Sequence, residues 1–238
     1  MPNQFLPHVE NGLLAGLPMN EWQRLKPQLQ LAALIPQATL HDGRTLIEHV
    51  YFPLSGSVSL VIEFLDGFST EAGDIGSEGM VGMPLVLGRE QSVTTAKVQV
   101  SGMALRMVGS ALVAQFSHLP TLHQNLLRYA GALMARSAQL SACNVHHMLN
   151  QRVARCLISL HDRSRRNDFG LTHENLATLL CVHRPSVSVS MKLLEQRGAI
   201  HQGSGWVTVT DRDSLEQASC ECHLILRDLR DAEDRSGV

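Results

Sequence analysis

The chain has 238 residues, of which 44% are hydrophobic and 18% charged, so it can bury a core and is not disordered throughout. No apolar run reaches the roughly 18 residues of a membrane-spanning helix, and the N-terminus lacks the basic start and apolar stretch of a secretory signal. Five cysteines are too few for a disulfide scaffold, so we expect a cytoplasmic protein with reduced thiols and no membrane partner.

The net charge of −2 is distributed unevenly along the chain. Residues 145–210 contain eight Lys or Arg and four Asp or Glu, a balance of +4, whereas residues 211–238 contain four and eight, a balance of −4. A basic segment inside an acidic chain is typical of a module that contacts DNA phosphates. The excess is small, so it supports a nucleic-acid partner without establishing one.

The N-terminal half changes its pattern near residue 38. Residues 1–34 are predicted to form an arm with short helices, because Trp22, Leu25, Leu29 and Ala32 recur at helical spacing. After it come short β-rich runs, and Asp66-Gly67 between two of them is a strong signal for a two-residue hairpin. No helical stretch is long enough for a crossover, so the spacing predicts an antiparallel β-roll. The expected strands are residues 45–52, 56–65, 70–75, 95–100 and 104–108, and residues 76–87 leave room for a short helix.

A long helix is predicted to follow the roll. Leucines recur every seven residues, which is the spacing of a two-stranded coiled-coil seam. We therefore expect a homodimer whose seam consists of Leu119, Leu126, Leu133 and Leu140. The alternative is a long amphipathic helix that lies on its own roll. A second helix is expected from about residue 147, followed by a polar linker over residues 162–170.

The last structured block is compact and has a specific spacing. A helix begins at residues 171–174, a turn occupies residues 181–183, and a second helix over residues 184–197 is ended by Gly198. A short hairpin then turns at residues 202–205, which completes a winged helix-turn-helix. The expected fold class is α+β: an N-terminal arm with a β-roll sensor domain (1–118), a dimerisation helix (119–146), a winged helix-turn-helix (147–213) and a C-terminal helical tail (214–238).

The second helix of such a motif enters the major groove of double-stranded DNA through its N-terminal residues. Arg184 is the best candidate for a bidentate contact to guanine, worth about 1–3 kcal/mol of discrimination. Lys192 and Ser186 are expected to bind phosphate and fix the register. The expected DNA-binding set is His183, Arg184, Ser186, Ser188 and Lys192. The alternative is a non-DNA interaction module that uses the same scaffold to bind another protein.

A β-roll, a long helix with a leucine repeat and a winged helix, in that order, resemble the Crp/Fnr superfamily of bacterial transcription regulators, most clearly at residues 171–200. The resemblance implies a homodimer on a palindromic operator, RNA polymerase as a further partner, and a cyclic-nucleotide-binding-like roll for a small-molecule effector. Arg184 matches the Arg that begins the recognition helix of the cyclic-AMP receptor branch. Pro185 replaces the Glu that follows it, so the operator of that branch is not expected.

The roll departs from the cyclic-nucleotide-binding pattern of the family. The stretches that bind ribose and phosphate correspond to residues 79–82 and 94–96, where Met80 replaces the ribose Glu and Thr94 replaces the phosphate Arg. A buried cyclic phosphate would then lack its counter-charge, so we expect no binding of cyclic AMP. The expected pocket for another effector is Met80, Val81, Met83, Thr94 and Thr95. The alternative is a filled roll without a ligand.

We expect no catalytic residue, metal or other cofactor. The roll has no closely spaced His and Glu ligands for an oxygenase metal, the first 142 residues contain no cysteine for an iron–sulfur cluster, and isolated histidines such as His41 are expected at the surface or in turns. The tail contains the sequence Ser-Cys-Glu-Cys-His, which ends in His223, and we predict one helix over residues 214–231 that includes it. There Cys220 would lie about 200° from Cys222, so we expect both to be structural, with metal binding or thiol switching as alternatives. Cys143 with His146 and His147 is a second metal candidate.

Overall fold

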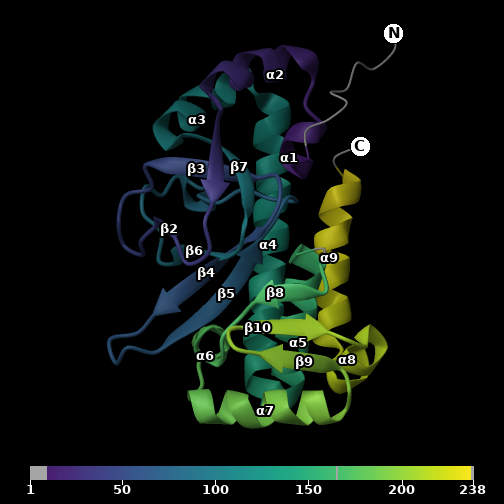
Figure 1. The fold of residues 1–238 in the computed structure, drawn as a ribbon. Helices are drawn as coiled ribbons and strands as arrows, with labels where there is room; N and C mark the ends of the chain where they lie inside the picture. The colour runs from purple at the N-terminus through teal and green to yellow at the C-terminus, as the bar shows by residue number, and fades with distance from the viewer. Residues whose placement is uncertain (1–9, 165, 237–238) are drawn as a thin grey trace.

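The computed structural model describes residues 10–164 and 166–236. The first nine residues of the expected arm, residue 165 of the linker and residues 237–238 of the tail lie outside the described residues. A β-roll forms the upper part of the molecule and a helical domain with a small sheet the lower part, and helix α4 runs beside both (Figure 1). Within the described ranges, no helix is both long and apolar enough to cross a membrane.

The N-terminal arm is helical only at its start. Helices α1 (Gly12–Ala15) and α2 (Met19–Leu25) and the 3-10 turn η1 (Lys26–Gln28) are followed by strand β1 (Gln30–Leu34). The helical spacing predicted through Ala32 is therefore wrong beyond η1. Residues of β1 instead pair with strand β7 in an antiparallel ladder, because tertiary pairing overrides a short helical pattern.

The roll consists of two antiparallel sheets, ordered β1-β7-β3 and β2-β6-β4-β5. Apolar side chains from the strands fill the space between the sheets, including Tyr51, Val58 and Ile75. The antiparallel roll predicted from the sequence is confirmed, and η2 (Met83–Leu85) is the short helix inside it. The remaining strands are β2 (Thr39–His41), β3 (His49–Pro53), β4 (Ser57–Glu63), β5 (Ser69–Ile75), β6 (Thr95–Val100) and β7 (Gly102–Val108).

The hairpin predicted at Asp66-Gly67 joins β4 and β5. Glu63 pairs with Ser69, and the Phe64 N–H donates to the Phe68 carbonyl, so the turn is longer than two residues. Gly67 has a φ of +85°, which a glycine adopts without strain. The hairpin extends below the roll toward the helical domain (Figure 1).

Helix α4 (Pro120–His146) follows α3 (Gly109–Gln115) and η3 (Phe116–His118). Leu119, Leu126 and Leu140 are buried within their own chain and Leu133 is half-buried, so the heptad leucines do not form an exposed seam. These four leucines instead fit the alternative prediction, in which α4 is an amphipathic helix packed on its own roll. A different line of small and apolar residues on α4 is exposed: Leu127, Gly131, Met134, Ala138, Ser141 and Val145.

A buried ion cluster joins the roll to α4 and to helix α5 (Leu149–Ser164). Arg136 on α4 contacts Asp74 at 2.6 Å and Glu78 at 3.2 Å. Arg163 on α5 contacts Asp74 at 2.9 Å and also binds Glu78 through two nitrogens. Burial opposes the ionisation of Glu78, but the two guanidinium groups outweigh it and lower its pKa to about 2. Four charges are thus held at the junction of three elements.

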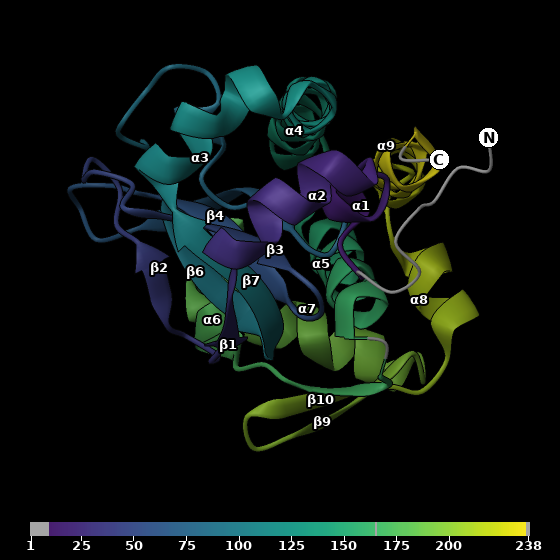
Figure 2. The same ribbon diagram turned by 90° about the horizontal axis from the view of Figure 1, so that it is seen from above.

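The C-terminal part contains a three-stranded sheet of order β8-β10-β9 and the helices around it. The linker predicted at residues 162–170 contains strand β8, whose backbone pairs with β10. The tail predicted as one helix consists of two, and α9 lies beside α4 (Figure 2). The elements are β8 (Asp168–Gly170), α6 (His173–Leu180), α7 (Arg184–Gln196), β9 (Ile200–Gly203), β10 (Trp206–Val209), α8 (Arg212–Ala218) and α9 (Cys222–Ser236).

Candidate nucleic-acid interface

Helices α6 and α7 form a helix-turn-helix, and individual residues explain where each helix begins and ends. Thr172 caps α6, because its hydroxyl accepts from the Asn175 N–H at 3.1 Å. Cys181 ends α6 in the left-handed conformation, and Pro185 lies in the first turn of α7, where its missing N–H costs nothing. Gly198 follows α7 with a φ of +75°. The two helices share a buried core that includes Leu176, Leu180, Val187, Met191 and Leu194.

The outer face of α7 carries the residues that the sequence assigns to DNA. Arg184, Ser186 and Lys192 are exposed, with the apolar Val189 between them. Because α7 forms the lower edge of the molecule, a duplex can approach this face (Figure 1). The exposed side of α7 therefore carries a guanidinium, a hydroxyl and an ammonium group, with Ser186 on the opposite edge of that side from Arg184.

Ser188 has a different environment from that predicted. Its hydroxyl lies 2.8 Å from Nδ1 of His173 and also contacts the Arg184 carbonyl, and the side chain is only partly exposed. Nε2 of His173 lies 2.8 Å from Gln202 Oε1 on the wing, and Gln202 Nε2 donates to Glu195 at 3.0 Å. In the free chain the Ser188 hydroxyl is thus already hydrogen-bonded, and its assignment to DNA stays a prediction. Sequence reasoning missed His173, because it precedes α7 by eleven residues and only the fold brings it to the wing.

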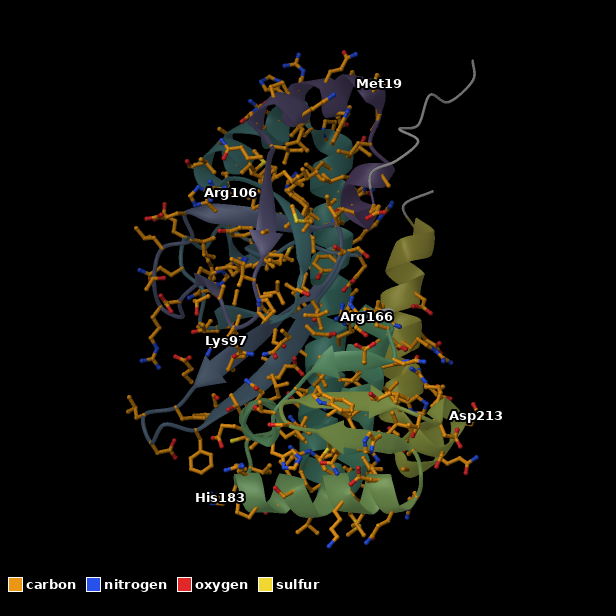
Figure 3. The ribbon with its side chains drawn as sticks, viewed as in Figure 1. Met19, Lys97, Arg106, Arg166, His183 and Asp213 are labelled. Atoms are coloured by element: carbon orange, nitrogen blue, oxygen red, sulfur yellow. The ribbon has the colours of Figure 1, made fainter. Side chains whose placement is uncertain are left out.

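His183 lies at the end of α7 nearest the β4–β5 hairpin (Figure 3). Its ring meets the ring of Phe68 edge-on, with the centroids 5.1 Å apart. The proposed DNA-reading end of the domain is therefore in direct contact with the roll. Nothing in the sequence pattern pairs these two residues, which are 115 positions apart.

A second candidate site is a cavity of about 520 Å³ between the roll and α4. Met83 and Thr94 line it, as predicted. Met80 and Val81 do not, because both are fully buried in the packed core, and Thr95 does not, because it is buried and accepts from the Gly43 N–H at 3.0 Å. Of the five residues predicted to form the effector pocket, Met83 and Thr94 therefore line this cavity and the other three do not.

The wall of this cavity is mostly apolar and includes Leu60, Ile75, Leu133 and Met134. Arg89 is the cation among the lining residues, and it is exposed. His41 also lines the cavity and is buried, contrary to the surface position expected for it. Burial lowers the pKa of His41, and neither ring nitrogen has a hydrogen-bond partner among the described residues. Both nitrogens are themselves buried, so a ligand in the cavity meets other atoms of the ring first.

Comparison with known proteins matches residues 151–218 to the Crp-like helix-turn-helix domain. Among solved structures, FixK2 from Bradyrhizobium japonicum has a TM-score of 0.67 at 13% identity and covers 81% of this chain and 98% of its own. A putative Crp/Fnr-family regulator from Eubacterium rectale has a TM-score of 0.68 at 16% identity, with 89% and 99% covered. A CRP-family regulator from Thermus thermophilus has a TM-score of 0.65 at 21% identity, with 79% and 96% covered.

No curated protein sequence matches the chain. The order of roll, long helix and helix-turn-helix is that of the solved regulators, and the domain match falls on α5 to α8, which contain the site described above. Residues 151–218 therefore form a Crp-like helix-turn-helix domain, and the chain as a whole has the fold of the solved Crp/Fnr-family regulators.

Proposed function

We propose that the protein is a sequence-specific regulator that binds a palindromic DNA operator as a homodimer through α7. The observation that carries this proposal is the exposed side of α7, where Arg184 begins the helix and Lys192 lies eight residues further along it. Arg184 then reads a guanine in the major groove, and Lys192 and Ser186 bind phosphate. Two half-sites lie about one helical turn apart, because the dimer axis relates two copies of α7.

The exposed line on α4 supports the homodimer. Leu127, Gly131, Met134, Ala138, Ser141 and Val145 alternate by four and three residues, which is the spacing of a heptad seam. Met134 is 69% exposed and Val145 90% exposed in the single chain. The small residues Gly131 and Ala138 allow two helices to approach closely. Association of two copies along this line covers side chains that one chain leaves in water.

The cavity suggests the kind of effector. Its apolar wall and its lack of a buried cation disfavour a cyclic nucleotide, whose phosphate needs a charged partner. We infer a mostly apolar ligand with a hydrogen-bonding group that faces Thr94. In this proposal residues 1–118 sense the effector, residues 119–146 form the dimer, residues 147–213 bind DNA and residues 214–238 form the tail. The family also implies RNA polymerase as the partner of the bound dimer.

The first test is the selection of genomic fragments by the purified, ligand-free protein, followed by sequencing of the retained DNA. We expect enrichment of one palindromic motif. If a folded dimer enriches nothing, either alone or with cell extract as a source of effector, the DNA-binding proposal is wrong. The non-DNA interaction module would then be the better description.

A further inference from the structure

Four side chains with metal-binding atoms meet where the end of α4 contacts the start of α9. They are Cys143, His147, Cys220 and Cys222, and one ligand atom from each lies within 4.8 Å of the others. The Sγ atoms of Cys143 and Cys220 are 3.6 Å apart, and Sγ of Cys222 is 3.7 Å from Nδ1 of His147. The three thiols are buried, with at most 2% of each residue exposed.

Local structure explains why residues from two distant segments meet here. Cys143 and His147 are four residues apart at the C-terminal end of α4, so they share one face. Helix α8 ends at Ala218 and α9 begins at Cys222, so the three residues between them are not helical. The single tail helix expected from the sequence would have separated Cys220 from Cys222. The break lets both thiols face Cys143.

The distances fit one metal ion of zinc size. Two thiolates bound to zinc at the usual Zn–S distance in a tetrahedron lie about 3.8 Å apart, close to the separations observed. An iron–sulfur cluster would need more widely spaced ligands, because several iron and sulfide atoms lie between them. Three cysteines and one histidine are a common ligand set of closed structural zinc sites. The cluster therefore has the composition and the size of such a site.

The groups around the four ligands also have the arrangement of a metal site. Nε2 of His147 lies 3.2 Å from a Glu221 carboxylate oxygen, which leaves Nδ1 directed at the thiols. A carboxylate on the outer nitrogen is the usual support of a metal-bound histidine. Gln139 Nε2 also donates to Sγ of Cys222 at 3.1 Å. A simple thiol pair would not require the histidine, its carboxylate partner or the third thiol.

We propose that Cys143, His147, Cys220 and Cys222 bind one zinc-class divalent ion in a closed, four-coordinate structural site. On binding, each thiol releases its proton to solvent and His147 donates a lone pair from Nδ1, so the site carries a net charge of −1. The ion fastens the start of α9 to the end of α4, directly beside the junction between α4 and α5. This proposal does not depend on DNA binding.

The test uses the full-length protein purified under reducing conditions without chelator. Elemental analysis is expected to find about one zinc ion per chain. After exchange, cobalt(II) is expected to give the visible bands of tetrahedral coordination and a near-ultraviolet thiolate charge-transfer band. Cys220→Ser and Cys222→Ser should lose most of both signals. Cys181→Ser, which changes a half-buried cysteine outside the cluster, should retain them.

Glu221→Gln provides a further variant that keeps all four ligands. We expect its zinc affinity to fall by about 10- to 100-fold, because the carboxylate no longer orients His147. A reduced, folded wild-type protein that takes up neither zinc nor cobalt would overturn the proposal, whatever the variants do. So would a Cys143–Cys220 disulfide in the native protein, or the recovery of iron with acid-labile sulfide.

Discussion

The ring of Phe68 lies edge-on against the imidazole of His183, with the two centroids 5.1 Å apart and the planes at 83°. Phe68 is on the β4–β5 hairpin of the roll, and His183 is the residue that precedes α7. The hairpin therefore contacts the end of the helix to which we assign DNA recognition. This contact links the roll to α7 directly, without α4 between them.

Phe68→Ala is expected to loosen the contact between the roll and the helix-turn-helix. An aromatic pair of this kind contributes about 0.5–1.5 kcal/mol. Amide hydrogen exchange should become faster in α6 and α7 and stay unchanged in β1, β3 and β7. Leu65→Ala, a change to a fully exposed residue of the same turn, is the control. Equal exchange in Phe68→Ala and the wild type would show that the contact restrains nothing.

Arg184→Ala and Lys192→Ala are expected to have different effects on DNA binding. Loss of a bidentate guanine contact should cost about 1–3 kcal/mol at one position of each half-site and relax the preference there. Loss of a phosphate contact should weaken binding on every sequence and reduce the salt dependence. Titrations on the selected operator, on operators with single base changes and at several salt concentrations distinguish these results. A uniform loss with Arg184→Ala would make Arg184 a phosphate contact.

The two faces of α4 can be compared by one substitution on each. Ala138→Glu places a charge on the exposed line, and we expect it to convert the dimer to a folded monomer in sedimentation experiments. Leu126→Ala removes a fully buried side chain, so it should lower the free energy of unfolding by about 2–5 kcal/mol without favouring the monomer. The opposite result, a dimeric Ala138→Glu and a folded monomeric Leu126→Ala, would restore the leucine seam.

Arg163→Met tests the ion cluster between the roll and α5. The substitution leaves Asp74 and Glu78 with only Arg136 as a cationic partner among the contacts described, so it should destabilise the protein by about 3–5 kcal/mol. Arg166→Met is the matched control, because the ion pair of Arg166 with Asp168 is exposed and contributes less than about 1 kcal/mol. Chemical denaturation measures both. Similar losses for the two variants would exclude a special role of the buried cluster.

Glu71 is expected to make stability depend on pH. Burial and the charge of Asp74 raise the pKa of Glu71 from 4.5 to about 7, although the hydroxyl of Ser59 donates to it. Between these values the folded protein keeps a proton that the unfolded chain has lost, so this group lowers the free energy of unfolding as the pH rises. Glu71→Gln should flatten the stability profile over this range. An unchanged slope in the variant would assign the dependence to another group.

The sequence predicts local elements better than it predicts which side chains meet. The helix-turn-helix follows from Pro185, Gly198 and the apolar spacing between them, which act within a few residues. The leucine repeat identifies α4 correctly but not its exposed face, because Leu119, Leu126 and Leu133 pack into the core of the roll. The cysteine cluster joins residues 77 positions apart, and it depends on the break after α8. The prediction of one continuous helix in the tail placed Cys220 and Cys222 on different faces and therefore missed the cysteine cluster.

That break has a consequence for which changes the tail tolerates. Within α9, Arg230 contacts Asp162 of α5 at 3.2 Å, so the orientation of the helix is fixed at its far part as well as at Cys222. Each residue added between Ala218 and Cys222 would lengthen this non-helical connection and displace Cys220 relative to Cys222, which now meet Cys143 together. The length of this three-residue segment is therefore constrained as well as the identity of its Cys220 and Glu221. We expect natural variants to substitute Ser219 in this segment while keeping its length, and to carry insertions or deletions beyond Arg230.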